Sequence, residues 1–168
     1  MRIRIKKVRD DIPTPSYAYK GDSGYDLIAA KDTIIEPGAT VKIPTGLSFE
    51  IAEGYELQIR PRSGVTSKTK LRVQLGTIDS NYRGEVSVIV DNVAIISTDE
   101  RDCLPERLDG VMDGWDADYT EHTYIIRKGD KIAQGVIAPV VQAKFEVVDE
   151  LDETNRGTGG FGSSGVKS

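Results

Sequence analysis

The sequence has very few of the residues that build metal centres and disulfide frameworks. Among 168 residues there is one cysteine, Cys103, and one histidine, His122, so an intramolecular disulfide is excluded. No C-x-x-C or H-x-E arrangement occurs, which argues against a structural zinc site and a zinc-dependent deaminase. A lone cysteine is typical of a protein in a reducing compartment, and we expect a cytoplasmic location.

Long apolar runs and an excess of positive charge are also missing. No apolar run approaches the roughly 18 residues that a membrane span requires. The first ten residues, MRIRIKKVRD, alternate charge with isoleucine, unlike a secretory signal, so we expect no membrane association. The net charge of -5 argues against direct binding to DNA. The negative charge does not argue against binding of a small phosphorylated ligand, because such a ligand needs only a few arginines and a divalent cation.

The residues that are present fit one β-rich domain. The chain is 38% apolar and 29% charged, as in globular proteins. Apolar residues alternate with a period of two in short runs, and only SGVTSKTK, residues 63–70, suggests a turn of helix. Many short strands predict an all-β sandwich or small barrel, jelly-roll topology included. The runs with strand character are Arg2–Val8, Tyr55–Pro61, Glu85–Val90 and Tyr124–Val140.

Two regions depart from this pattern. Residues 94–123 are acidic and irregular and contain the only tryptophan, so we interpret them as an insertion within a single domain that spans residues 1–148. Residues 149–168 are first acidic and then almost entirely glycine and serine. Because such a tail buries too little apolar surface to offset its backbone entropy, we predict a C-terminal arm that is mobile without ligand.

Two stretches place a carboxylate near apolar residues. In DSGYDL, residues 22–27, Asp26 has apolar neighbours. Such a carboxylate is usually paired or close to a cation, although a solvent-facing strand position is an equal alternative. In GTIDSNYRGEV, residues 76–86, Asp79 precedes a turn and is a candidate general base. The alternatives are that Asp79 caps this turn and that Tyr82 is a core aromatic.

Two further stretches carry groups suited to specific polar contacts. In PRSGVTSK, the guanidinium of Arg62, the hydroxyl of Ser63 and backbone N–H groups near Gly64 can converge on an anion. An ordinary turn with exposed charges is the more common outcome for such a stretch. In RKGDKIAQGVI, Gln134 lies inside an apolar run, where an amide is expected to have a specific hydrogen-bond partner.

The stretch RGTGGFGSSG, residues 156–165, contains a literal G-x-G-x-x-G. A dinucleotide fingerprint requires a strand before it and a helix after it, and this stretch offers neither. A P-loop also fails, because no lysine follows directly after the second glycine. Taken alone, the stretch is equally well explained as a flexible, solvated tail.

Together and in this order, DSGYDL, PRSG, GTIDSNYRG, GDKIAQGVI and RGTGGFGSSG resemble the five motifs of the trimeric dUTPase family, the deoxyuridine triphosphate nucleotidohydrolases. They extend from residue 22 to residue 165. The resemblance implies a jelly-roll fold and a homotrimer with active sites at the subunit junctions. It also implies hydrolysis of dUTP to dUMP and pyrophosphate, with Mg²⁺ as the cofactor.

The resemblance further implies roles for individual residues. Asp79 would activate the water that attacks the α-phosphorus, and Ser63 would lie near the α–β bridge, where leaving-group charge develops. Asp26 would hold the sugar side of the site and the water shell of a magnesium ion bound mainly by the triphosphate. The residues implied to contact the phosphate chain are Arg62, Gly64 and Gln134.

The sugar, the base and the arm complete the implied site. Tyr82 would lie under the deoxyribose and leave no room for a 2′-hydroxyl, while backbone groups after it would read the uracil edge. In the arm, Arg156 would pair with the γ-phosphate and Phe161 would stack over the uracil. The remaining substrate-contacting residues implied are Gly76, Gly162, Ser163 and Ser164.

The insertion departs from the family pattern. Residues 94–123 are far longer than the short hairpin that most members have there, and similar insertions occur in some phage-encoded members, for which the location would be the host cytoplasm. The segment is either a tolerated loop or a contact surface for a regulatory protein. Two alternative functions stay open: a dCTP deaminase-like reaction on the same superfold, and a regulatory protein-binding role through the insertion. The candidate contact residues are Leu108, Met112, Trp115 and Tyr119.

Overall fold

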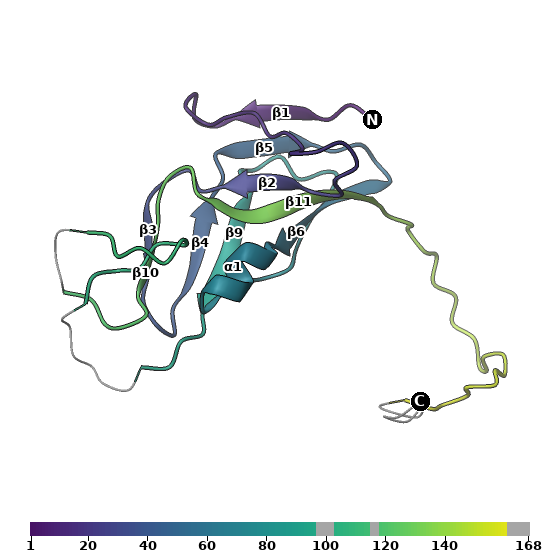
Figure 1. The fold of residues 1–168 in the computed structure, drawn as a ribbon. Helices are drawn as coiled ribbons and strands as arrows, with labels where there is room; N and C mark the ends of the chain where they lie inside the picture. The colour runs from purple at the N-terminus through teal and green to yellow at the C-terminus, as the bar shows by residue number, and fades with distance from the viewer. Residues whose placement is uncertain (97–102, 115–117, 161–168) are drawn as a thin grey trace.

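The computed structural model describes residues 1–96, 103–114 and 118–160 (Figure 1). Within these ranges the chain forms eleven β-strands and one short helix, which confirms the expected all-β fold. In chain order the elements are β1 (Arg4–Lys7), β2 (Tyr25–Ile28), β3 (Thr33–Ile35), β4 (Thr40–Pro44), β5 (Leu47–Glu50), β6 (Tyr55–Pro61), α1 (Ser63–Lys68), β7 (Leu71–Val73), β8 (Gly76–Ile78), β9 (Ser87–Asn92), β10 (Tyr124–Ile126) and β11 (Lys131–Pro139).

The strands assemble into antiparallel sheets whose neighbours are often distant in the sequence. The largest sheet has the order β2–β11–β6–β8, and a second has the order β4–β9–β7. Two shorter pairs, β1–β5 and β10–β3, extend the body (Figure 1). Long-range antiparallel pairings of this kind are typical of jelly rolls. Four of the five motif segments lie on the largest sheet or directly after one of its strands.

Alternation along β6 determines what each face of this sheet carries. Leu57 and Ile59 are buried in the core, whereas Gln58 and Arg60 point to the opposite face. Side chains directly opposite one another on paired strands share a face, so Gln134, which pairs with Arg60, also lies on that outer face. The largest fully buried side chains of the core are Ile12, Leu27, Ile35, Ile43, Leu47, Leu57, Leu71, Ile126, Ile132, Val86, Val88 and Val90.

The insertion lies between β9 and β10, as expected, and its described part is fastened to the body. Residues 103–114 turn back on themselves, with the Arg107 N–H donating to the Val111 carbonyl at 2.8 Å. The Glu106 N–H donates to the Thr123 carbonyl at 2.8 Å, and the Glu106 carbonyl accepts from the Ile125 N–H at 2.9 Å. The insertion is therefore bonded along the start of β10. Trp115 lies outside the described residues.

After β11 the described chain leaves the body of the domain. Among the described residues, the final backbone hydrogen bond to the body joins the Val140 N–H to the Gly54 carbonyl at 2.8 Å. Residues 141–160 run away from the sheets (Figure 1), and on this segment Phe145 and Val147 are 96% and 100% exposed. No helix in the described ranges has the length and apolarity that crossing a membrane requires.

Candidate active site

The carboxylate of Asp26 on β2 is held by two cations. Its Oδ1 lies 2.9 Å from Nε of Arg62, and its Oδ2 lies 2.8 Å from Nζ of Lys131. Arg62 also donates from Nη1 to the backbone carbonyl of Lys131 at 3.0 Å. The side chains of Asp26 and Arg62 are only 20% and 29% exposed, so water screens this pair less than a surface ion pair. Of the two equal alternatives for Asp26, the structure shows the paired carboxylate.

A bulge in β11 explains how two of its residues reach this carboxylate. Lys131 pairs with Ile28 and Gln134 pairs with Asp26, and the register shifts between Lys131 and Ala133. Three steps along β11 therefore match two steps along β2, which is the mark of one extra residue. In a regular strand, residues three apart face opposite sides of the sheet. The bulge instead brings Lys131 and Gln134 to the same face, beside Asp26.

Free polar groups lie next to the cations. Ser63 begins α1 directly after Arg62. The Ser63 hydroxyl and the Gln134 amide have no hydrogen-bond partner within the described part of the chain. A Cβ at Gly64 would meet no atom within 4 Å, so the space beside it is open. Open space lined by a guanidinium and unpaired donors is the arrangement that an anionic ligand requires.

Asp79 follows β8 and starts a tight turn. The Tyr82 N–H donates to the backbone carbonyl of Asp79 at 3.1 Å, so the backbone closes this turn. The Asp79 carboxylate makes no hydrogen bond or ion pair with any described residue. The structure thus does not support the alternative in which this side chain caps the turn. An unpaired carboxylate of this kind can accept a hydrogen bond from a water molecule.

Tyr82 packs against its own hairpin and is not a core residue. Its side chain is 45% exposed, and its hydroxyl donates to the Glu85 carbonyl at 3.2 Å. A Cβ at Gly84 would lie 2.3 Å from the Tyr82 hydroxyl oxygen, so only glycine permits this ring position. Glu85 anchors the hairpin, because its Oε1 accepts a hydrogen bond from the Gly46 N–H at 2.8 Å.

Asp79 and Tyr82 line a pocket of about 280 Å³ on this side of the sheet. Its other walls include Lys42 on β4 and Thr77 on β8. Gly76 pairs with Ile59, and a Cβ at Gly76 would come within 3.1 Å of the Ile59 side chain. Packing therefore accounts for the glycine at this position, and a contact of Gly76 with substrate stays a prediction.

The cluster around Asp26, Arg62 and Ser63 and the pair Asp79 and Tyr82 lie at opposite ends of β6. Asp79 directly follows Ile78, which pairs with Leu57 near the start of β6, whereas Arg62 and Ser63 follow the last residue of that strand. Asp79 is therefore level with Glu56, six residues before Arg62, and at about 3.4 Å per residue the separation along the strand is roughly 20 Å. A single phosphate group cannot contact both groups of one chain.

Arg156 lies in the exposed C-terminal segment, away from both groups. Its Nε donates to the backbone carbonyl of Gly159 at 2.8 Å, a contact within the segment itself. The other arm residues expected at the site, Phe161, Gly162, Ser163 and Ser164, lie outside the described residues. Their expected contacts with ligand stay predictions.

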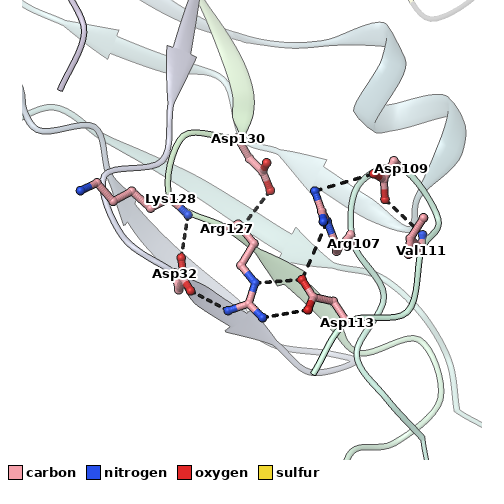
Figure 2. Close-up of polar contacts among 8 residues, drawn as sticks. All are labelled: Asp32, Arg107, Asp109, Val111, Asp113, Arg127, Lys128 and Asp130. Carbon is pink, nitrogen blue, oxygen red and sulfur yellow. Dashed lines mark hydrogen bonds and ion pairs between the residues drawn. The ribbon is translucent and has the colours of Figure 1, made fainter. Parts of the chain in front are cut away.

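Sequence analysis did not single out two basic residues that the structure makes prominent. Both lie in RKGDKIAQGVI, where the apolar pattern draws attention to Gln134 alone. Arg127 donates to both carboxylate oxygens of Asp113 at 2.9 and 3.0 Å and from Nη1 to Asp32 at 2.6 Å (Figure 2). The partners of both residues come from distant parts of the chain, so no local pattern could have found them.

The aspartates around Arg127 are ionised at neutral pH. The hydrogen bond from Arg127 holds the pKa of Asp113 below its ordinary value of 3.8. The backbone N–H of Lys128, followed by Arg127, lowers the pKa of Asp32 in the same way. Because both folded-state pKa values are lowered, the associated stability is complete above the ordinary aspartate pKa and is lost as the pH falls through the lowered values.

The donor set fits a magnesium ion that arrives with a ligand. The described ranges contain no group of three His, Cys, Asp or Glu side chains that could hold a metal ion. Both oxygens of Asp26 already face cations, and its side chain is 20% exposed, which suits contact through water. Mg²⁺ usually keeps several waters and binds through one or two carboxylates together with phosphates.

Comparison with protein families matches residues 10–104 and 117–165 to the dUTPase family. The matched ranges contain all five motif segments and leave out residues 105–116 of the insertion. This chain belongs to the dUTPase family.

Bacterial relatives match almost the whole chain. The deoxyuridine 5'-triphosphate nucleotidohydrolase of Nautilia profundicola is 42% identical over 98% of this chain and 99% of its own. The corresponding protein of Caulobacter vibrioides is 40% identical over 99% of this chain and 96% of its own. These relatives are thus about as long as this chain, insertion included.

Solved structures of phage enzymes share the fold. A dUTPase of Staphylococcus bacteriophage 80alpha in complex with dUpNHpp is 31% identical, with a TM-score of 0.92 over 98% of this chain and 99% of that chain. The dUTPase from phage phi11 of Staphylococcus aureus, which has a species-specific insert, is 32% identical, with a TM-score of 0.86 over 92% of this chain and 100% of that chain. A variant of the phi11 protein coordinates a structural Mg(II) ion. The jelly-roll-type fold is therefore confirmed.

The Asp26–Arg62 pair should be coupled more strongly than a surface pair. In a double-mutant cycle with Asp26→Asn and Arg62→Gln, we expect a coupling energy of about 1–2 kcal/mol in the free energy of unfolding, because both groups are partly desolvated. The matched control is Arg4–Glu50, whose side chains are 76% and 40% exposed. Its coupling should stay below about 1 kcal/mol. Equal values in urea titrations would show that Asp26 is solvated like a surface residue.

Proposed function

We propose that this protein hydrolyses dUTP to dUMP and pyrophosphate, with Asp79 activating the water that attacks the α-phosphate. Family membership and full-length similarity to deoxyuridine 5'-triphosphate nucleotidohydrolases support this function. The observation that carries it is the free Asp79 carboxylate, which lines the same pocket as Tyr82. The same similarity argues against the alternative dCTP deaminase-like reaction.

The water is activated by position and charge. Asp79 accepts a hydrogen bond from a water molecule and orients its lone pair toward the α-phosphorus. As the new P–O bond forms, Asp79 takes up the proton, and the bond from the α-phosphorus to the α–β bridging oxygen breaks. Water activation by a positioned carboxylate contributes typically about 10²–10⁴-fold to such a rate. The absence of a competing partner on Asp79 supports this role.

The cluster around Asp26 binds the phosphates. Arg62 and the Ser63 hydroxyl contact the phosphate oxygens near the α–β bridge, where charge develops on the leaving pyrophosphate. The Gln134 amide and the backbone at Gly64 supply further donors. Asp26 faces the water shell of a magnesium ion carried by the triphosphate, which when bound neutralises phosphate charge.

The hairpin selects the sugar and the base. The Tyr82 ring provides a rigid floor for deoxyribose, because Glu85 and Gly84 fix its position. A 2′-hydroxyl on the sugar would collide with that floor. Backbone groups after Tyr82 hydrogen-bond the uracil edge, and a cytosine would leave these buried groups unpaired. Loss of paired polar contacts gives strong discrimination.

We further propose that copies of this chain assemble into a homotrimer with shared active sites. The roughly 20 Å between Asp79 and Arg62 along β6 means that the two groups meet only when they come from different copies. A single chain also leaves apolar side chains open to solvent. Phe145 and Val147 are exposed, and Ile5 and Tyr25 line a cavity of about 650 Å³. Apolar surface of this kind favours association.

The C-terminal arm closes over bound nucleotide. Arg156 pairs with the γ-phosphate, and Phe161 stacks over the uracil. Gly162 lets the backbone lie against the ligand, while Ser163 and Ser164 donate hydrogen bonds to the phosphates. Closure of such a segment excludes water and completes the site. Residues 141–160 make no backbone hydrogen bond to the body, which is consistent with an arm that acts on another copy.

A second role for the insertion is favoured by its surface. Val111 and Met112 at its turn are 55% and 58% exposed. Phage dUTPases with similar folds control transfer of virulence genes. A regulatory protein that binds residues 94–123 therefore stays a prediction, as does the cytoplasmic location. Direct DNA binding is not proposed, because the net charge is -5.

The first experiment is a pyrophosphate-release assay with Mg²⁺ on dUTP, dTTP, dCTP and UTP. We expect turnover of dUTP alone, because the hairpin excludes a 5-methyl group, a cytosine amino group and a 2′-hydroxyl. Ammonia release from dCTP is measured in parallel. Absence of selective dUTP turnover in folded protein would overturn the proposed function, and ammonia release would replace it with deamination.

Shared sites can be tested by mixing two inactive variants. Asp79→Asn and the double variant Arg62→Gln/Ser63→Ala should each lack activity, with nucleotide binding largely retained in Asp79→Asn. After subunit exchange at equal concentrations, about one quarter of wild-type activity should return, because one site in four combines intact groups from two copies. If the mixture stays inactive, both groups belong to the same chain.

The arm can be tested by two truncations. Removal of all residues after Leu151 should leave the urea midpoint unchanged and reduce dUTP turnover severely, because the described part of this segment, residues 152–160, makes no hydrogen bond to the body. Removal of only Val166–Ser168 retains RGTGGFGSSG and is the matched control. Full activity in the shorter protein would show that the arm has no catalytic role.

A further inference from the structure

Side-chain contacts fix the turn that leads into β11. Figure 2 shows Arg127 between Asp113 of the insertion and Asp32 of the β2–β3 loop. Asp32 also accepts a hydrogen bond from the Lys128 N–H at 2.7 Å, and Asp130 accepts one from the Arg127 N–H at 2.8 Å. We call the Asp113–Arg127 pair the insertion clamp.

Backbone hydrogen bonds join this turn to the strand that carries Asp26. The Gly129 N–H donates to the Ala29 carbonyl at 2.8 Å, and the Ala29 N–H donates to the Asp130 carbonyl at 2.9 Å. Asp26 lies three residues before Ala29, and Lys131 directly follows Asp130. The turn therefore determines how the beginning of β11 sits against β2.

The position of the bulge depends on this alignment. Lys131 and Gln134 face Asp26 together only because the extra residue lies between them. A slip of one residue would move a side chain to the other face of the sheet. Ala133 onward is already held by pairing with β6, whereas Lys131 precedes that pairing and depends on the turn.

The insertion clamp adds a contact from outside the sheet. Nε of Arg107 lies 3.8 Å from Oδ2 of Asp113, the oxygen that also accepts a hydrogen bond from Nε of Arg127. This ion pair is too long for a hydrogen bond, but it means that Asp113 faces two guanidinium groups. The bidentate geometry with Arg127 fixes orientation as well as distance. The insertion thus holds the side chain at the first position of the turn.

We infer that Asp113 and Arg127 are positioning residues for the phosphate-binding side of the active site. The insertion clamp holds turn 127–130, the turn keeps the bulge in place, and the bulge keeps Lys131 closed on Asp26. Movement of residues 103–114 away from the body would weaken binding of the triphosphate. The inference rests on the proposed function, since it assigns these residues to the same site.

Asp113→Asn tests the inference against a matched control. It removes the charge that faces Arg127 with almost no change in shape, and we expect KM for dUTP to rise about three- to tenfold with kcat nearly unchanged. Asp109→Asn is the control, because Asp109 lies on the same turn and interacts with Arg107 and the Val111 N–H. An equal rise in KM in both variants would overturn the inference.

A double-mutant cycle separates positioning from general destabilisation. If the insertion clamp acts through Lys131, Asp113→Asn should raise KM no further in a Lys131→Met background. Fully additive effects on KM would mean that the insertion clamp does not act through Lys131, and the inference would be wrong.

Hydrogen exchange gives a readout that does not require activity. In Asp113→Asn, faster exchange should extend from residues 103–114 into residues 127–136, while Asp109→Asn leaves 127–136 unchanged. Faster exchange confined to 103–114 would contradict the inference. If the wild-type protein fails to hydrolyse dUTP, the proposed function is wrong, and exchange still decides whether the insertion clamp holds β11.

Discussion

The carboxylate of Asp26 is the point on which the proposed phosphate-binding side of the site depends. It attracts Arg62 from the end of β6 and Lys131 from the start of β11, and its own strand lies beside β11. Without the carboxylate, the positive charges of Arg62 and Lys131 would repel one another. The carboxylate between them permits a concentrated positive site for phosphates in a protein whose net charge is -5.

The two proposed parts of the active site lie at opposite ends of β6, and this separation gives a reason for the chain to assemble into an oligomer. The strand is a rigid spacer, so the hairpin proposed to select the base and the cluster proposed to bind phosphates in one chain cannot converge by side-chain movement. In the proposed homotrimer each copy contributes different groups to different sites. Assembly would then be required for the reaction as well as for burial of the apolar surface that a single chain leaves exposed.

The insertion illustrates how a loop becomes part of a domain. Loop-closure entropy rises slowly with length, so a long insertion between β9 and β10 costs little by itself. Here the segment is bonded along β10 through Glu106 and to the β10–β11 turn through Asp113. A segment that the family match omits in part is thereby in contact with the turn that leads into a motif strand.

The all-β class, the insertion and the five motifs can be predicted from the amino-acid sequence alone, because period-two alternation and turn residues act locally. Local pattern left a paired and a solvent-facing position of Asp26 as equal alternatives. Which cations pair with Asp26 depends on the fold, because the bulge that turns Lys131 and Gln134 to one face arises from pairing β11 with β2. The partners of Arg127 and the distance between Asp79 and Ser63 are likewise long-range, and no local periodicity encodes such contacts.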